Sequence, residues 1–116
     1  MEKFRNLIVW QKAHQLVLDV YHLILKFPSD EKFGLISQMR RSAVSVAANI
    51  VEATKRKTIK DRSNFHLIAD ASLEELKYYF ILTSDLKFIT QQQEEELTEQ
   101  CREIGRMLNA FTKSLQ

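Results

Sequence analysis

Residues 38–57 read QMRRSAVSVAANIVEATKRK, and this stretch contains the pattern that decides the fold. Its apolar side chains recur at alternating intervals of four and three residues, which is the spacing of one α-helical face; they are Met39, Ala43, Val46, Ile50 and Ala53. Polar side chains repeat these intervals one position earlier, about 100° around the helix; they are Gln38, Ser42, Ser45, Asn49 and Glu52. The stretch therefore predicts a helix, extending over 34–56, on which a polar line runs beside the apolar stripe.

The same alternation marks three more segments, at residues 7–27, 58–86 and 90–115. In the first segment the stripe is Trp10, Ala13, Val17, Val20, Ile24 and Phe27. In the segment at 58–86 it is Phe65, Ala69, Ser72, Leu76, Tyr79, Thr83 and Leu86. In the last segment it is Leu97, Cys101, Ile104, Leu108, Phe111 and Leu115. Each segment is predicted to be an amphipathic helix that turns its stripe toward a shared interior.

Residues suited to helix ends separate these segments. Pro28 disfavours helix in the residue before it, Thr58 is suited to cap the third segment, and Thr90 with Gln93 forms a capping-box pattern. The chain has only two glycines and one proline in 116 residues, which argues against an all-β domain with many tight turns. Because the connections are short, neighbouring helices must run antiparallel. The prediction is an all-α protein in which residues 1–116 form a single antiparallel up-down-up-down four-helix bundle.

The polar line on residues 38–52 has two interpretations. It can face water, or a second helix can cover it and hydrogen-bond to it. Small side chains such as Ser45 and Ala48 would allow a close approach, and Ser72 and Glu75 are suitable partners from the segment at 58–86. A buried polar group without a partner costs about 1–3 kcal/mol, so a covered line has to be hydrogen-bonded. The second interpretation predicts a seam formed by Gln38, Ser45, Asn49, Glu52, Ser72 and Glu75.

Two motifs in these segments resemble a known family. They are Leu35-x-x-Gln38-x-x-Arg41-x-Ala43-x-Ser45-Val46-x-x-Asn49-Ile50-x-Glu52 and Ala69-x-x-Ser72-Leu73-x-Glu75-Leu76. Together with Leu7-x-Val9-Trp10 and Phe27-Pro28, they resemble the 23S rRNA intervening sequence proteins, a family of bacterial four-helix bundles, over essentially the whole chain. Ala53 and Ala71 stand where that family usually has glycine. The resemblance implies a homopentamer. It also implies a likeness to the accessory protein of diversity-generating retroelements, which binds nucleic acid and a reverse transcriptase.

The charge is distributed unevenly along the chain. Residues 31–63 hold eight basic and three acidic side chains, a net charge of +5, whereas residues 64–116 hold five basic and nine acidic ones, a net charge of −4. The candidate nucleic-acid-binding residues are Arg40, Arg41, Lys55, Arg56, Lys57, Lys60 and Arg62. The first two lie about four turns before the others and form a separate patch. No aromatic residue interrupts 55–62, so contact with phosphates is expected rather than base stacking. The alternative is a solvated loop with ordinary lysines.

Signatures of catalysis and of metal binding are sparse. Asp19-x-x-His22 occurs once, whereas a di-metal bundle needs a paired motif. We expect no metal, no cofactor and no enzymatic activity. His14, His22 and His66 are expected at the surface or its boundary, and Cys101 is expected in the core. No signal peptide and no apolar run of about 18 residues is apparent, so a cytoplasmic protein without membrane contact is expected.

Two functions follow from these patterns. The first is an oligomeric, non-catalytic protein that binds structured RNA or DNA through the basic helix junction. The second is a ring-shaped adaptor for a protein partner such as a reverse transcriptase or another polymerase, suggested by the acidic run Glu94–Glu96. Apolar side chains outside the main stripes belong either to a broad core or to a subunit interface; they include Leu18, Leu25, Val44, Val51, Tyr78, Phe80, Leu82, Phe88 and Ile89.

Overall fold

The computed structural model describes residues 1–115 and consists of four long helices, with no strand among these residues. The helices are α1 (Ile8–Ile24), α2 (Ser37–Ala53), α3 (Ile59–Asp85) and α4 (Gln91–Ser114). A 3-10 helix, η1 (Lys3–Asn6), precedes α1. The 3-10 turn η2 (Ser29–Glu31) and the π-helical turn η3 (Lys32–Ile36) connect α1 to α2. The predicted all-α class is confirmed.

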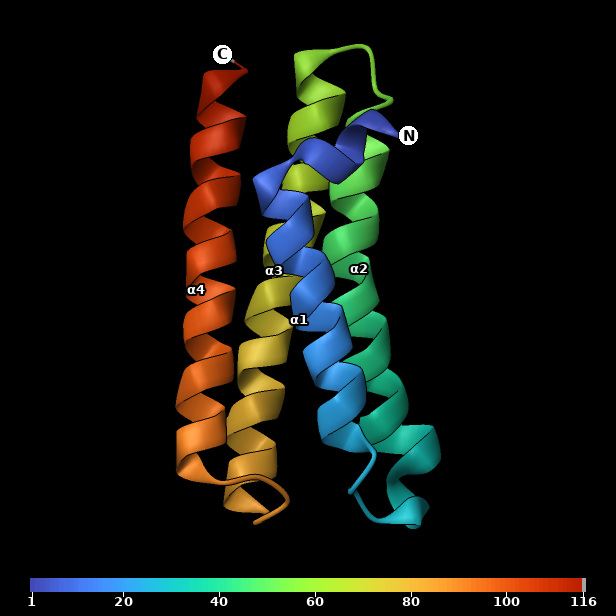
Figure 1. Cartoon of the computed structure of the whole chain (residues 1–116), viewed down its shortest axis with the longest axis vertical. Coiled ribbons are helices and arrows are strands. Elements are labelled where there is room, and N and C mark those ends of the chain that lie inside the picture. Colours follow the sequence, from blue (N-terminus) through green and yellow to red (C-terminus); the bar gives the residue numbers. More distant parts are fainter. Residues whose placement is uncertain (116) are drawn as a thin grey trace.

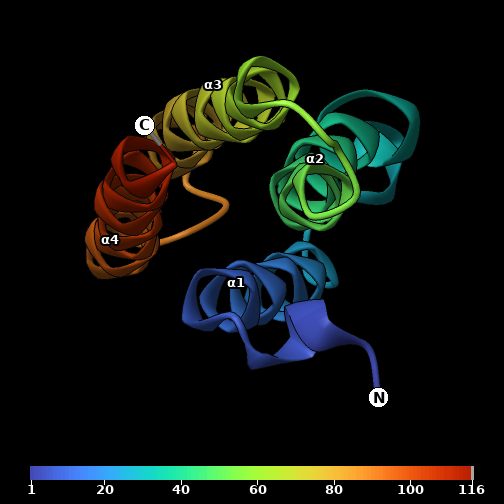
Figure 2. The ribbon, with the colours of Figure 1, turned by 90° about the horizontal axis from the view of Figure 1, so that it is seen from above.

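The four helices lie side by side, and each runs opposite to the one before it (Figure 1). Seen along the bundle, they occupy the corners of a square in chain order, so that α1 lies diagonally across from α3 (Figure 2). The neighbouring pairs are packed together, and the contact between α2 and α3 is the most extensive. The bundle measures 43 × 24 × 23 Å. The α2–α3 connection therefore lies at one end, and the α1–α2 and α3–α4 connections lie at the other (Figure 1).

Two predicted helix caps are present. The Asp61 backbone N–H donates to Thr58 Oγ1 at 3.1 Å, which begins α3. At the start of α4, the Gln93 N–H donates to Thr90 Oγ1 at 3.0 Å, and the Thr90 N–H donates to Gln93 Oε1 at 2.8 Å. This reciprocal pair satisfies two backbone donors that no helical carbonyl can reach.

The apolar stripe predicted on residues 39–53 lies in the core over its whole length. Met39, Ala43, Val46, Ile50 and Ala53 are all buried. Leu76 of α3 and Ile104 of α4 are buried against the same interior, and Val17 of α1 is half-buried and packs on it. Among the apolar residues outside the stripes, Phe80 and Ile89 are buried in the core, whereas Leu18, Leu25, Val44 and Tyr78 are exposed.

On α3 the predicted stripe was partly wrong. Ala69, Leu76 and Thr83 are buried as predicted, but the line beside them that faces the interior is Leu73 and Phe80. The predicted line on their other side holds the half-buried Phe65, Ser72 and Tyr79, and Leu86 is exposed beyond the helix end. The two lines have equivalent helical spacing. Leu73 and Phe80 are purely apolar and lie in the interior, whereas the Ser72 and Tyr79 hydroxyls lie where they can hydrogen-bond.

Candidate nucleic-acid interface

A seam of hydrogen-bonded polar side chains joins α2 to α3. Ser42 Oγ donates to Glu75 Oε1 at 2.6 Å, and Ser72 Oγ donates to Ser45 Oγ at 2.8 Å. Asn49 Nδ2 donates to Ser45 Oγ at 3.0 Å and to the Ser45 carbonyl at 2.7 Å. The covered interpretation of the polar line therefore describes its middle. Because the Ser42–Glu75 and Ser72–Ser45 hydrogen bonds form in only one alignment, they set the register of α2 on α3.

The two ends of the predicted seam do not reach α3. Gln38 and Glu52 are both exposed. Glu52 instead pairs with Arg56, four residues later in the chain, with its Oε2 lying 3.5 Å from the arginine Nη2. Gln38 and Glu52 were included in the seam because of their helical spacing. That spacing does not show over what length of α2 the side chains are covered by α3.

The connection between α2 and α3 carries a group of lysines that follows the seam in the chain. We define Lys55, Lys57 and Lys60 as the basic junction. These lysines lie in the connection after α2 and in the first turn of α3. All three are exposed, and none takes part in an ion pair among residues 1–115. Three solvated ammonium groups that hold no carboxylate are available to bind an external anion.

Arg56 and Arg62, which were predicted to belong with these lysines, brace the connection instead. The Arg56 guanidinium lies 4.5 Å from the centre of the Phe65 ring, a cation–π contact, and also faces Glu52. Arg62 Nε donates to the Arg56 carbonyl at 2.8 Å. An aromatic side chain thus does lie under the basic run, although it comes from the next turn of α3. The sequence signal for it was the spacing of Phe65 one turn after Asp61.

Arg40 and Arg41 lie in the first half of α2, about 20 Å along the helix axis from the junction. The Arg40 guanidinium lies 5.3 Å from the centre of the Tyr21 ring of α1, and Arg41 is exposed. The seven predicted residues therefore form no single surface. The structure divides them into three free lysines, two bracing arginines and a distant arginine pair.

His66 was expected at the surface or its boundary, and that expectation was wrong. The residue is buried, and its Nδ1 lies 2.7 Å from Thr112 Oγ1 on α4. Burial lowers the pKa of His66 from its ordinary value of 6.5. Cys101 is buried as expected, and burial raises the pKa of its thiol to about 12. The thiol is therefore neutral at physiological pH, which makes it a poor nucleophile or metal ligand.

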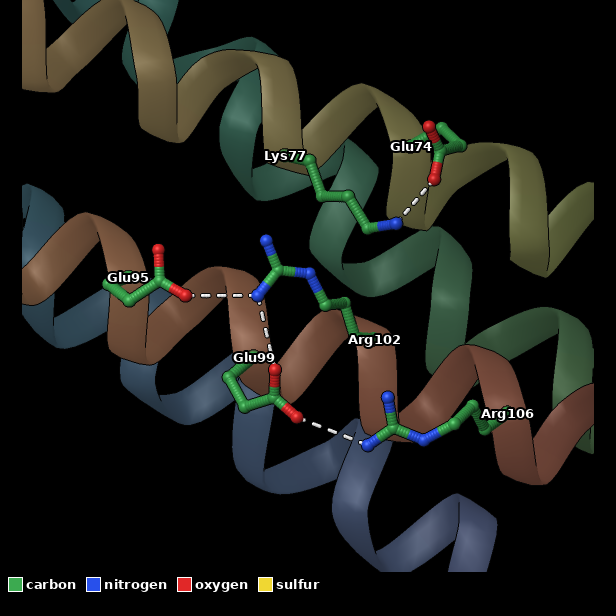
Figure 3. A network of polar contacts seen from close by, with 6 residues as sticks. All are labelled: Glu74, Lys77, Glu95, Glu99, Arg102 and Arg106. Atoms are coloured by element: carbon green, nitrogen blue, oxygen red, sulfur yellow. Dashed lines mark hydrogen bonds and ion pairs between the residues drawn. The ribbon is translucent and has the colours of Figure 1, made fainter.

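The outer face of α4 carries a ladder of ion pairs (Figure 3). Arg102 Nη1 lies 3.0 Å from Glu95 Oε1 and 3.1 Å from Glu99 Oε2, and Arg106 Nη2 lies 3.1 Å from Glu99 Oε1. Hydrogen bonds from Arg106 and Arg102 lower the pKa of Glu99. Part of the acidic run at the start of α4 is thus paired within the helix. That start lies at the opposite end of the bundle from the junction (Figure 1).

The described residues contain no group of side chains of the kind that a metal centre needs. Across residues 1–115, His, Cys, Asp and Glu side chains nowhere gather in a set of three or more that could hold a metal ion. No helix within that range is both long enough and apolar enough to span a membrane.

Comparison with known proteins supports the resemblance seen in the motifs. The family model for the 23S rRNA-intervening sequence protein matches residues 5–110. No curated protein matches the sequence. A solved structure of a protein with unknown function from the S23 ribosomal protein family, from Bacteroides thetaiotaomicron, is 27% identical, with a TM-score of 0.84. The alignment covers 91% of this chain and 96% of that one. The chain belongs to the 23S rRNA-intervening sequence protein family.

Proposed function

We propose that this protein is a non-catalytic, oligomeric bundle that binds structured nucleic acid, RNA or DNA, through the basic junction. The observation that carries the proposal is the group of three exposed lysines, Lys55, Lys57 and Lys60, that hold no carboxylate within the described chain. A phosphate backbone releases counterions when such groups bind it, and this release favours association at low salt.

The neighbourhood of the junction favours backbone contact over reading of bases. Phe65 is the aromatic side chain nearest to these lysines in sequence, and its face is covered by the Arg56 guanidinium. A ring already engaged in this way is not free to stack on a base. Lysine is a flexible point charge that fits phosphates without a fixed orientation. We therefore expect affinity that depends strongly on salt and weakly on sequence.

Assembly would concentrate this charge, and the outer face of α3 supports assembly. Leu67, Tyr78 and Ile81 recur at helical spacing there and are 66%, 57% and 48% exposed. Ala71 lies on the same line, where its small side chain would let another helix approach. A pentamer is the state that the family resemblance implies, and a cytoplasmic location is part of the same proposal. Light scattering on the purified protein measures the number of subunits.

The decisive experiment compares two double variants in binding to a dye-labelled RNA hairpin. K55A/K57A removes two junction lysines, whereas K26A/K113A removes two exposed lysines elsewhere and serves as the charge-matched control. The junction variant is expected to reduce the slope of log K against log salt by about 2, since each phosphate contact contributes about 0.9 on duplex nucleic acid. Equal slopes for the two variants would refute the proposal.

A protein-binding adaptor, for instance for a reverse transcriptase or another polymerase, is the second candidate. Its support is the start of α4, where Glu94 and Glu96 hold no ion pair among the described residues. These carboxylates lie at the end of the bundle away from the junction, so both surfaces could be occupied together (Figure 1). A protein that co-purifies stoichiometrically after nuclease treatment, and is lost in E94Q/E96Q, would support this function.

A further inference from the structure

The end of the bundle opposite the junction has a hollow of its own, between α1, η3 and the first half of α2. Its volume is about 610 Å³. Its lining includes Tyr21, Lys32, Phe33, Arg40, Arg41 and Val44. It lies about 20 Å along α2 from the basic junction, so a ligand bound here would not touch those lysines.

The hollow exposes two aromatic rings, and that of Phe33 takes no part in the core. Phe33 is 91% exposed, which is far more than the hydrophobic effect favours for a ring of this size. Tyr21 is 41% exposed. Leu35 and Ile36 of the same turn are buried, so this turn directs other side chains into the core and leaves Phe33 outside it. An exposed ring at the rim of a hollow indicates a surface that stacks against a ligand.

Cations surround these rings without acidic partners. Lys32, Arg40 and Arg41 all line the hollow, no carboxylate lines it, and none of the three forms an ion pair among residues 1–115. The Arg40 guanidinium lies over the Tyr21 ring, and the buried Arg40 Nε has no hydrogen-bond partner among residues 1–115. The Lys32 ammonium lies 5.7 Å from the centre of the Phe33 ring, farther than Arg56 lies from Phe65, and Phe33 stays 91% exposed, so its ring remains open to a base.

The nearest acidic side chain on α1 is already engaged. Asp19 lines the adjoining groove, which Arg40 also borders. Its Oδ1 accepts a hydrogen bond from Gln15 Nε2 at 2.9 Å. This neutral donor leaves the charge of Asp19 in place, so Asp19 offsets Arg40, whereas Lys32 and Arg41 line the hollow without bordering that groove.

We propose that this hollow binds single-stranded nucleic acid, with an unpaired base stacked on Phe33 and the adjoining phosphates held by Arg41 and Lys32. Every base offers a flat face to an aromatic ring, and arginine and lysine hold the backbone beside it. A duplex keeps its base faces covered by their neighbours and does not fit such a site.

The lining also favours a nucleic acid over an apolar peptide. A groove that binds the apolar face of an amphipathic helix needs several aliphatic side chains to contact its anchor residues. Here Val44 is the one aliphatic side chain, and the remainder of the lining is aromatic, cationic or hydroxyl-bearing. Ser37 supplies a hydroxyl that suits the polar edge of a base, whereas the hydroxyl of Ser45 is engaged in the seam.

The test measures the affinity of a dye-labelled 12-nucleotide oligouridine by fluorescence anisotropy. F33A is expected to weaken binding at least about fivefold, the lower limit for loss of one base stack. L25A is the matched control, because Leu25 is an exposed apolar residue at the same end that does not line the hollow. R41A is expected to weaken binding and flatten its salt dependence, whereas K26A, which removes an exposed cation outside the hollow, is not.

A direct readout of stacking comes from F33W. Its added indole emission is expected to be quenched by the oligouridine, whereas the emission of the wild-type protein, which comes from Trp10 on α1, is not. F33L separates stacking from general hydrophobic contact, because leucine keeps apolar surface and loses the aromatic face.

The outcomes distinguish this site from the junction. K55A/K57A is expected to retain oligouridine binding and quenching, so failure of the junction proposal leaves this one standing. The inference is overturned if the wild-type protein does not bind the strand, or if F33A or F33L binds it as the wild type does. It is also overturned if light scattering shows that F33A splits the oligomer, since the face would then be a contact between copies of this chain.

Discussion

The α2–α3 seam and the outer face of α4 use similar polar chemistry in opposite surroundings. In the seam, the buried Ser42 and the exposed Glu75 join two different helices across their interface. On α4, Glu95, Glu99 and Arg102 join successive turns of one helix in open solvent. A bond between two helices constrains the tertiary structure, whereas a bond within one helix constrains only that helix. The difference teaches that helical spacing alone does not reveal which polar line matters for the fold.

The largest expected effect on the free energy of unfolding comes from the apolar interior, on which both α3 and α4 pack. Phe80 of α3 is fully buried, and F80A is expected to lower the free energy of unfolding by about 3–5 kcal/mol through lost burial and the cavity left behind. Urea titration followed by circular dichroism measures it. I59A, which truncates a 50% exposed side chain of the same helix outside the proposed assembly face, is the control and is expected to cost much less. Equal losses would mean that the interior does not lie where the structure places it.

The seam itself is tested by S42A. This variant removes the donor to Glu75 and is expected to cost about 1 kcal/mol of unfolding free energy. S63A makes the same chemical change at a buried hydroxyl that has no hydrogen-bond partner, so it is expected to be neutral or stabilising. The same urea titration compares the two. If both variants lose the same stability, loss of the hydroxyl alone explains the effect of S42A, and the hydrogen bond between the helices contributes no stability.

The contrast between these regions also explains what the sequence could and could not predict. The stripe from Met39 to Ala53 was predicted without error because only one line of α2 is continuously apolar. On α3, helical spacing placed Ser72 and Leu73 equally well on the same face as Ala69. Leu73 points into the core because Ser72 hydrogen-bonds to Ser45 on α2, and the spacing within α3 does not show this partner. Local pattern determines which residues share a face, whereas tertiary contact determines which of two neighbouring faces points inward.

The candidate binding residues show the same limit. Charge counting identified Arg40, Arg56 and Lys57 as one class, because the sequence shows each only as a cation. The structure separates them by their partners: Arg40 lies over a ring of α1, Arg56 over a ring of α3, and Lys57 over none. Such partners come from distant turns or other helices. A pattern confined to residues 55–62 could not reveal them.

A smaller effect is expected from pH, through His66 between α3 and α4. Because burial lowers its pKa in the folded protein, the unfolded chain binds more protons below about pH 6.5, the ordinary value. The contribution of His66 is therefore fully present above that pH and is lost as the pH falls through the lowered folded pKa. H66Q is expected to flatten the stability profile below about pH 6.5. A variant profile as steep as that of the wild type would contradict this assignment.

The smallest effect on stability is expected on the outer face of α4. R102A removes the partner of Glu95 and one of the two partners of Glu99, yet these groups are exposed, so water replaces the lost contacts. The loss is expected to be smaller than that of S42A in the same titration. The pKa of Glu99, followed by NMR, is expected to rise toward 4.5, because Arg102 is one of the two hydrogen-bond donors that lower it. A stability loss equal to that of S42A would show that an exposed ladder within one helix stabilises this fold as much as a covered bond between two.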